Sequence, residues 1–163
     1  MSMRKGILRL SAVVALALLV CAGAPAAADR ALPLFNVADA AGAAVPSTDL
    51  AQGNNWILIY TRVACEPCAQ LLNVLKIDDP PAWTARIRVV AGGATPEGLA
   101  AMQQQFPQLT GASWYADADG SVARALSLSG APAVFGMRDR AIAWTSQGSL
   151  PISRTLIAGW VNQ

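Results

Sequence analysis

The order of apolar and polar residues predicts strands and helices that alternate along the chain. Trp56–Tyr60 is an unbroken apolar run, which is typical of a strand buried on both faces. Shortly afterwards the apolar residues recur at the spacing of one helix face: Cys68, Leu71, Leu72 and Leu75. The pattern therefore predicts a buried strand that leads into an amphipathic helix.

Two further elements are predicted between residues 78 and 107. Asp78–Pro81 breaks the first helix, and the alternating segment Arg86–Val90 predicts a second strand. Thr95 is placed to cap a second helix, because a proline and a glutamate follow it in the first turn. This helix is predicted to end near Pro107. Its apolar side is expected to hold Leu99, Met102 and Phe106.

The last third of the chain predicts a short strand, a short helix, a hairpin and a final helix. We expect the strand at Ala112–Tyr115 and the short helix at Val122–Leu126. Ala133–Met137 and Ala141–Thr145 are joined by a polar turn and predict a β-hairpin. The final helix is predicted to begin within Ser149–Pro151. Its apolar side is expected to hold Leu156, Ile157 and Trp160.

The order of these elements indicates the fold class. The segment before the first buried strand, Asp29–Asn55, is expected to be extended, with a turn at Asp39–Gly42. Alternating strands and helices favour an α/β fold with a parallel part, and the hairpin adds antiparallel strands. We therefore expect a single α/β domain with a central mixed β-sheet flanked by helices.

The N-terminal segment has the layout of a secretory signal peptide. Three basic residues within the first nine precede an apolar run over residues 10–20, and Ala22–Ala28 is rich in small residues. We expect cleavage after Ala28, with Ala24 and Ala26 as alternatives, so that residues 1–28 are the signal peptide and 29–163 the exported domain. The apolar run is shorter than the about 20 residues of a membrane span. A retained N-terminal anchor, or a lipid on Cys21, is the less favoured alternative.

Charge and composition exclude several functions. Residues 29–163 carry nine basic and ten acidic side chains, a net charge of −1, without a basic cluster that contains aromatic residues. We therefore expect no nucleic-acid partner. The chain has no histidine, which excludes Cys–His and Ser–His catalysis as usually built and histidine ligation of zinc or haem. Two cysteines beyond the signal peptide are too few for a four-cysteine metal site, so neither a metal nor another cofactor is expected.

Cys65-Glu66-Pro67-Cys68 carries the candidate chemistry. A C-x-x-C pair can close into a disulfide and reopen by thiol–disulfide exchange. A purely structural disulfide is the alternative, but it would close a very small loop and stabilise the fold weakly. Cys65 falls at the predicted helix N-terminus, where unpaired N–H groups favour the thiolate and lower the thiol pKa. Cys65 is thus the candidate nucleophile, and Cys68, one turn further on, is the candidate resolving thiol.

Several residues near the motif have two interpretations. Pro67 falls in the first helical turn, where a missing N–H costs little. Glu66 either tunes Cys65, because a carboxylate opposes thiolate formation, or is a solvated residue that suits the helix dipole. Asp117–Gly120 predicts a turn rather than a calcium loop, because the remaining ligands are missing. Pro132 precedes a predicted strand, and base rates favour a trans bond there over a cis bond.

Together these segments resemble the thioredoxin superfamily and, within it, the TlpA/ResA-like periplasmic thiol–disulfide oxidoreductases. The similarity runs from about Leu34 to the C-terminus. The segments that carry it are Asp39–Gly42 with Val45, Leu50 and the strand Trp56–Tyr60, the motif Cys65–Cys68 in its Glu-Pro form, and Asp117–Gly120 with Ser129–Phe135.

The resemblance implies a thioredoxin fold in which a cis Pro132 faces the cysteine pair. The backbone of Ala131 would there pair with a client segment in a short β-type contact. The resemblance also implies an enzyme that reduces disulfides of client proteins outside the cytoplasm, for instance in cytochrome c maturation, with electrons from a membrane thiol reductase. We expect the protein to be a monomer.

The chain departs from the family pattern in three places. Ala64 stands where the family usually has tryptophan, and Leu71 and Asn73 stand where it commonly has an acidic residue and a proline. Arg140 occupies a turn in which glycine is usual. These departures leave the client pathway unassigned. Two alternatives therefore stay open: a disulfide oxidant or isomerase of the same fold, and a binding or chaperone-like module whose disulfide is only structural.

Overall fold

The computed structural model describes residues 29–51, 53–75, 82–148 and 152–163. Its elements, in chain order, are β1 (Arg30–Ala31), β2 (Asn36–Ala38), β3 (Ala44–Pro46), α1 (Ser47–Leu50), β4 (Asn55–Arg62), α2 (Glu66–Val74), the 3₁₀ helix η2 (Ala82–Arg86), β5 (Ile87–Gly92), α3 (Pro96–Gln105), the 3₁₀ helix η3 (Pro107–Leu109), β6 (Ser113–Asp117), α4 (Ser121–Ala125), β7 (Ala133–Arg138), β8 (Ala141–Gln147) and α5 (Arg154–Val161).

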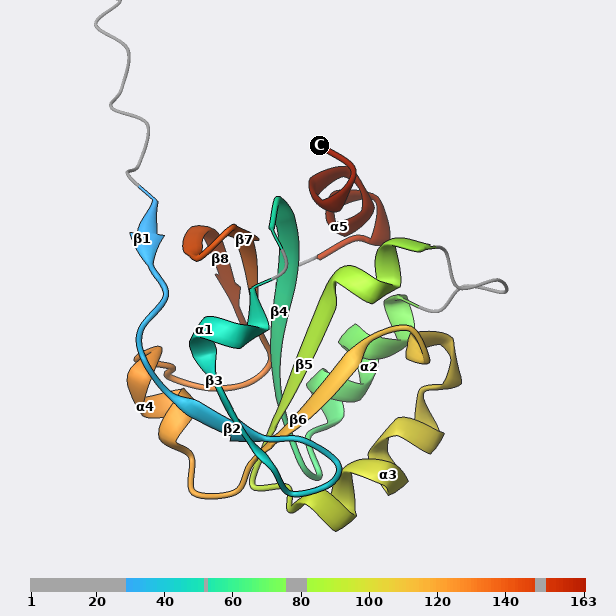
Figure 1. Ribbon diagram of the computed structural model, residues 1–163. Helices are drawn as coiled ribbons and strands as arrows, with labels where there is room; N and C mark the ends of the chain where they lie inside the picture. Colours follow the sequence, from blue (N-terminus) through green and yellow to red (C-terminus); the bar gives the residue numbers. More distant parts are fainter. Residues whose placement is uncertain (1–28, 52, 76–81, 149–151) are drawn as a thin grey trace, which may run out of the picture.

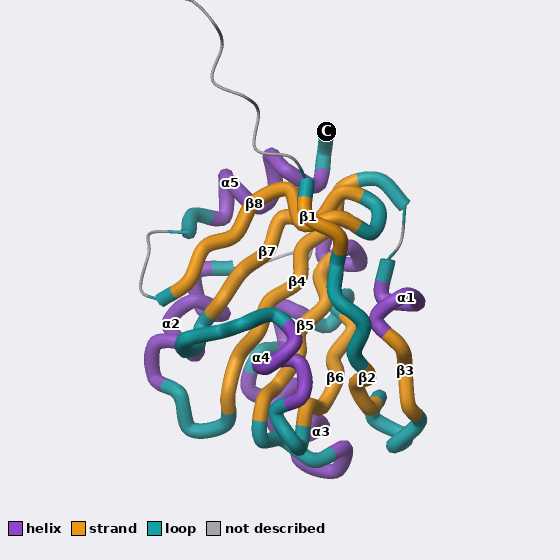
Figure 2. The backbone as a smooth tube through the Cα atoms, turned by 90° about the vertical axis from the view of Figure 1, so that its left-hand side faces the viewer, coloured by secondary structure: helices purple, strands orange, loops and turns teal. Residues whose placement is uncertain are grey.

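The strands form one mixed sheet with helices on both faces (Figure 1). The strand order is β1-β8-β7-β4-β5-β6-β2-β3, and Figure 2 shows these strands side by side across the molecule. β4, β5 and β6 are parallel, whereas β7 runs antiparallel to β4. This arrangement confirms the predicted α/β domain with a central mixed sheet, and β7 and β8 form the predicted hairpin.

Strand β4 lies in the middle of the sheet and separates two apolar layers. Its residues are buried except for Arg62, as predicted for a strand covered on both faces. On one face Ile59 packs with buried residues of α2 and α5, such as Leu72 and Ile157. On the other face Tyr60 packs in a cluster that includes residues of α1 and α4. The carboxyl end of β4 therefore emerges between two well-filled layers.

The antiparallel pairing of β4 with β7 determines what lies beside the end of β4. Tyr60 near the carboxyl end of β4 is the register partner of Ala133, the first residue of β7. The loop that precedes β7 is consequently held against the loop that follows β4. Two segments almost 70 residues apart in sequence, around Cys65 and Pro132, are brought together in this way.

Two helix starts in the described part of the chain are capped by a hydroxyl side chain, and the cap at Thr95 is the predicted one. Thr95 caps α3 by accepting a hydrogen bond from the Gly98 N–H at 3.3 Å. Helix α5 is capped by Ser153, which accepts from the Leu156 N–H at 3.2 Å. The predicted start of this last helix at Ser149–Pro151, and the predicted break at Asp78–Pro81, lie outside the described residues.

Three details differ from the predictions. The lead-in is not merely extended, because β2 and β3 form a hairpin around the predicted turn and α1 follows. Arg88 does not belong to a polar strand face: it is 1% exposed, and its Nη1 donates to the carbonyls of Ala85 and Ile87. Leu156 is 48% exposed, and α5 buries Val161 beside Ile157 instead.

Among the described residues, no helix combines the length and the apolar character that crossing a membrane requires.

Candidate active site

Cys65 and Cys68 form a disulfide at the start of helix α2. The S–S distance is 2.03 Å and the two Cα atoms are 5.2 Å apart. Cys65 is the N-cap residue of α2, and its Sγ accepts a hydrogen bond from the Cys68 N–H at 3.3 Å. The sulfur of Cys65 therefore lies at the positive end of the helix, where a thiolate is stabilised.

The two sulfurs differ in their access to solvent. Cys65 is partly exposed, whereas Cys68 is 1% exposed and belongs to the buried face of α2 together with Leu71 and Leu72. An external disulfide can reach only the first of these sulfurs without moving the helix. The pair is thus arranged for attack at Cys65 and internal exchange with Cys68.

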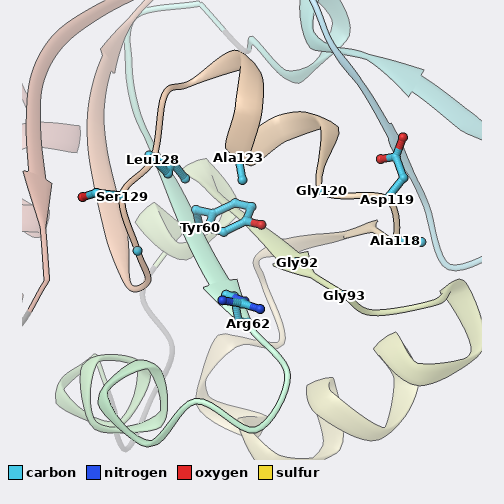
Figure 3. A pocket seen from close by; sticks show the side chains of 11 residues that line it. Tyr60, Arg62, Gly92, Gly93, Ala118, Asp119, Gly120, Ala123, Leu128 and Ser129 are labelled. Carbon is cyan, nitrogen blue, oxygen red and sulfur yellow. The ribbon is translucent and has the colours of Figure 1, made fainter.

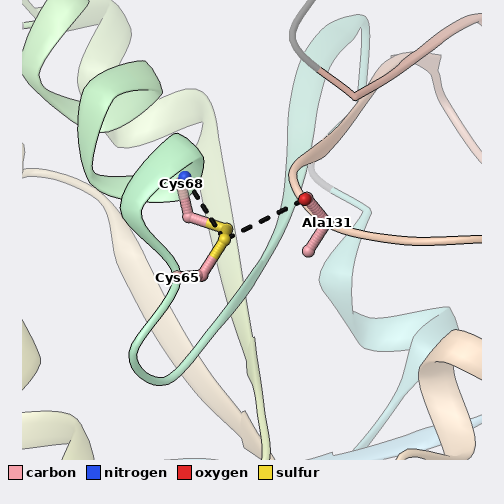
Figure 4. Close-up of a disulfide and its surroundings, with 3 residues drawn as sticks. All are labelled: Cys65, Cys68 and Ala131. Atoms are coloured by element: carbon pink, nitrogen blue, oxygen red, sulfur yellow. Dashed lines mark hydrogen bonds between the residues drawn. A yellow bond between two sulfur atoms is a disulfide. The ribbon is translucent and has the colours of Figure 1, made fainter.

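The loop before β7 faces the disulfide from the opposite side. The peptide bond between Ala131 and Pro132 is cis. The carbonyl oxygen of Ala131 lies 3.9 Å from the Sγ of Cys65 (Figure 4). In the oxidised protein that sulfur carries no proton, so the contact becomes a hydrogen bond only when Cys65 is a thiol. The structure therefore brings Ala131 and Pro132, both singled out in the sequence, to the side of the cysteine pair.

The residues between the cysteines lie at the surface. Glu66 and Pro67 are both exposed and occupy the first turn of α2. The Glu66 carboxylate accepts a hydrogen bond from the Gln70 side chain at 3.3 Å, one turn further along the same helix. This contact fits the interpretation of Glu66 as a solvated first-turn residue.

A buried polar network ties β4 to the segment that leads to the cis-proline. The Tyr60 hydroxyl donates to one carboxylate oxygen of Asp117 at 3.2 Å. The other oxygen accepts from the Ser121 hydroxyl and the Val122 N–H, each at 3.2 Å, so Asp117 also holds the start of α4. Burial, and next the charge of Asp117, raise the pKa of Tyr60 from 10.0 to about 12. The phenol is therefore neutral and keeps its donor role over the physiological range.

A cavity of about 380 Å³ opens beside this network on the α4 face of the sheet. Figure 3 shows the Tyr60 ring between Leu128 and the Gly92–Gly93 turn, with Arg62 below it at the end of β4. Gly92 is required there, because a Cβ at this position would collide with the Tyr60 hydroxyl. The cavity thus borders the loop that carries Ser129 toward the cis-proline, without reaching the disulfide itself.

The sequence arguments missed Arg62 and the Tyr60–Asp117 pair. Arg62 is an exposed cation at the end of β4, three residues before Cys65, and lines a cavity with both cysteines. Arg62 could have been found, because it is a charged residue at the end of an apolar strand, just before the motif. Tyr60 and Asp117 are 57 residues apart, and their pairing has no local sequence signal.

Neither a protein-family model nor a curated protein matches the chain. Solved structures do match. A secreted Mycobacterium tuberculosis disulfide oxidoreductase homologous to E. coli DsbE is 18% identical, with a TM-score of 0.63 over 78% of this chain and 94% of that chain. A thiol:disulfide interchange protein of Bacteroides sp. is 14% identical, with a TM-score of 0.62 over 83% of this chain and 90% of that chain.

The same fold also appears in a peroxidoxin. Peroxidoxin BcpB of Mycobacterium tuberculosis is 14% identical, with a TM-score of 0.61 over 82% of this chain and 93% of that chain. Identities this low establish the fold alone. The chain therefore has the thioredoxin-like fold predicted from its sequence, and its reaction has to be argued from the site.

Proposed function

We propose that the protein is a thiol–disulfide oxidoreductase that reduces disulfides of client proteins through Cys65 and Cys68. The observation that carries this proposal is the asymmetry of the pair: an accessible sulfur at the N-terminus of α2 is linked to a buried one. A disulfide that served only to stabilise the fold would need no accessible sulfur and would close a longer loop. The arrangement therefore favours exchange over a structural role.

The reaction has two balanced steps. In the reduced protein the Cys65 thiolate attacks one sulfur of a client disulfide, whose S–S bond breaks, and the released client thiolate takes a proton from water. The Cys68 thiolate then attacks the Cys65 sulfur and releases the second client thiol. The protein ends as the Cys65–Cys68 disulfide, and two electrons have passed to the client. A dithiol of a separate reductase has to return the protein to its reduced form.

The loop before β7 is proposed to orient the client. The Ala131 carbonyl lies next to the attacking sulfur, and backbone groups at such a position can pair with an extended client segment. Pro132 holds the direction of this loop. Glu66 and Pro67 are proposed to adjust the reactivity of Cys65 from the first turn of α2, Glu66 through its charge and Pro67 through the shape of the turn.

Direction and location are further parts of the proposal. Reduction of clients outside the cytoplasm, after removal of residues 1–28, is supported by the signal-peptide pattern and by the resemblance to TlpA/ResA-like proteins. The electron donor is then a membrane thiol reductase, and cytochrome c maturation is one client pathway of this kind. Equilibration with glutathione buffers tests the direction, because a potential near the about −120 mV of a strong oxidant would contradict it.

Insulin reduction tests the activity itself. We expect the protein to accelerate insulin precipitation by dithiothreitol, and Cys65→Ser to remove the acceleration. Cys68→Ser should instead accumulate mixed disulfides with clients, because Cys65 can still attack but is no longer released. Wild-type activity at the background level would refute the proposal and favour a binding module with the same fold.

A further inference from the structure

A second cavity, of about 360 Å³, borders the disulfide on the side of α2 and α3. Its lining includes both cysteines and three residues at the end of α3: Met102, Gln105 and Phe106. Ala131 does not line it, and Figure 4 shows that residue across the disulfide from α2. A client that approaches Cys65 past Ala131 therefore meets this cavity, here called the α3 cavity, on the far side of the sulfur.

The walls of the α3 cavity are mixed, and buried apolar residues form one part of them. Leu72 and Phe106 are buried core residues, and Met102 packs against the same core. The charged lining residues, Arg62 and Glu66, are exposed, as is Gln105, and Thr61 adds a buried hydroxyl. A bound group would thus bury apolar surface against the core residues, while polar atoms attached to it stay near charges of both signs.

The size of the cavity suits one large side chain rather than a second folded molecule. Ligand pockets range from roughly 300 to 1,000 Å³, so this one is at the lower end. A polypeptide places neighbouring Cα atoms about 3.8 Å apart, so the residue next to a client cysteine is within reach when the cysteine sulfur meets Cys65. The part of the wall formed by Leu72, Met102 and Phe106 is apolar and favours an aromatic or long aliphatic side chain.

We propose that the α3 cavity is a specificity subsite that receives an aromatic or long aliphatic side chain adjacent to the target cysteine of a client polypeptide. This inference rests on the proposed function, because the subsite has a role only when a client sulfur reaches Cys65. In this proposal the two sides of the disulfide have different roles in client binding. The loop at Ala131 holds the client backbone, and the α3 cavity selects among clients by side chain.

The opposite side of α3 provides a matched control. A cavity of about 370 Å³ lies there and is lined by Gln104 and Trp114, among other residues, but by neither cysteine. Gln104 and Gln105 are neighbours in sequence, both are exposed, and each lines a different cavity. The same substitution at these two positions therefore tests whether contact with the disulfide, rather than the mere filling of a cavity, affects selection.

The experiment measures reduction of two disulfide-linked fluorogenic peptides by the reduced protein. The peptides are identical except for phenylalanine or alanine next to the cysteine. Each turnover converts one protein dithiol and one peptide disulfide into the protein disulfide and two peptide thiols. We expect kcat/KM to be about tenfold or more higher for the phenylalanine peptide, because burial of the phenyl ring stabilises the complex and alanine has no such group.

Two variants assign the preference to the α3 cavity. Gln105→Trp should reduce the phenylalanine-to-alanine ratio to near 1, because the indole would occupy the cavity. Gln104→Trp should keep the wild-type ratio and the wild-type rate with the alanine peptide. Circular dichroism and thermal melting of both variants show whether they are folded, and Met102→Trp, which enters the same cavity from a half-buried position, is the second filling variant.

The outcomes separate the subsite from the proposed function. Equal rates with the two peptides in the wild type, or a preference that persists in both filling variants, would overturn the subsite while leaving the oxidoreductase intact. No reduction of either peptide would overturn both proposals. Concentration-dependent dimerisation that Gln105→Trp abolishes, together with equal peptide rates, would assign the cavity to a second copy of the chain and also overturn the subsite.

Discussion

The two ends of strand β4 differ in how completely their polar groups are hydrogen-bonded. At the amino end, the Trp56 indole donates to the Asp139 carbonyl at 2.7 Å, and the Asn55 amide donates to the Trp160 carbonyl at 3.0 Å. The Trp160 indole in turn lies 3.2 Å from the carbonyls of Trp56 and Met137 and stacks edge-on against Trp144. Helix α5 is thereby fastened to the sheet.

The carboxyl end of the same strand keeps several groups in unfavourable states. The Thr61 hydroxyl is buried and has no hydrogen-bond partner in the described part of the chain. Ala64 has a φ of 54°, in the left-handed region that is unfavourable for alanine, whereas Asn54, with a φ of 56° before the amino end, is a residue type that tolerates this region. Two cavities open there as well. Local defects of this kind are tolerated where a site needs space and exposed reactive groups, because packing elsewhere provides the stability.

Trp56→Ala, at the amino end of β4, should give the largest loss of stability and should leave the disulfide at the carboxyl end unaffected. Trp56 is fully buried, so we expect a loss of about 3–5 kcal/mol in the free energy of unfolding. Urea denaturation measures it, with Val74→Ala, at a residue 51% exposed, as a control expected within about 0.5 kcal/mol of wild type. Disulfide-exchange activity per folded molecule should not change. An activity that falls along with stability would show that the two ends are not separable.

Tyr60→Phe tests a well-satisfied polar group near the carboxyl end. Because the folded-state pKa of about 12 exceeds the ordinary 10.0, the folded protein holds the phenol proton more tightly than the unfolded chain. The stability that this provides is complete below pH 10 and is lost as the pH rises toward 12, by about 2 kcal/mol. Urea denaturation at pH 9 to 11.5 should show wild type losing more stability than Tyr60→Phe, and parallel pH profiles would contradict this.

Thr61→Val should change stability in the opposite direction. Removal of a buried hydroxyl that lacks a partner should raise the free energy of unfolding by about 1 kcal/mol. Thr145→Val, at an exposed position of β8, is the matched control and should stay close to wild type. Thermal melting and urea denaturation compare the three proteins. A less stable Thr61→Val would mean that the Thr61 hydroxyl has a hydrogen-bond partner, and it would contradict the difference between the two ends of β4.

The smallest expected effects concern the two charges beside Cys65. Glu66→Gln should lower the pKa of the Cys65 thiol, because it removes a nearby negative charge, and Arg62→Gln should raise it. Both changes should be small, because the side chains are exposed and water screens their charges. The pH dependence of iodoacetamide alkylation in a Cys68→Ser background measures them. Arg154→Gln, on the distant helix α5, should leave the pKa unchanged, and shifts of equal sign in the first two variants would reject the electrostatic explanation.

The long, periodic elements of the fold could be predicted from the sequence. The buried strand, the helix after Cys65, the Thr95-capped helix and the terminal hairpin all have strong local patterns, and the structure confirms them. The lead-in could not be resolved because β1, β2 and β3 are only two or three residues long and form by pairing with distant strands. Arg88 looked exposed because a charged residue in an alternating segment normally faces solvent.

Only part of the candidate site could be predicted from local patterns in the sequence. The spacing of Cys65 and Cys68 identified the disulfide, and the helix pattern after it identified Cys68 as the buried partner. The Tyr60–Asp117 bond and the α3 cavity depend on how separate strands and helices meet, so no window of sequence contains them. Charges and cavities around a motif therefore need the tertiary structure, even where the reactive residues are evident without it.

Arg62 links the surfaces on the two faces of the sheet. Of these two cavities in the described part of the chain, Tyr60 lines the one near the cis-proline loop, Thr61 lines the α3 cavity, and Arg62 lines both. Selection acting on residue 60 or 61 can alter one surface and leave the other as it was. A change at residue 62 alters the charge beside both cavities at once, so at this position the charge of the proposed subsite cannot change without changing that of the other cavity.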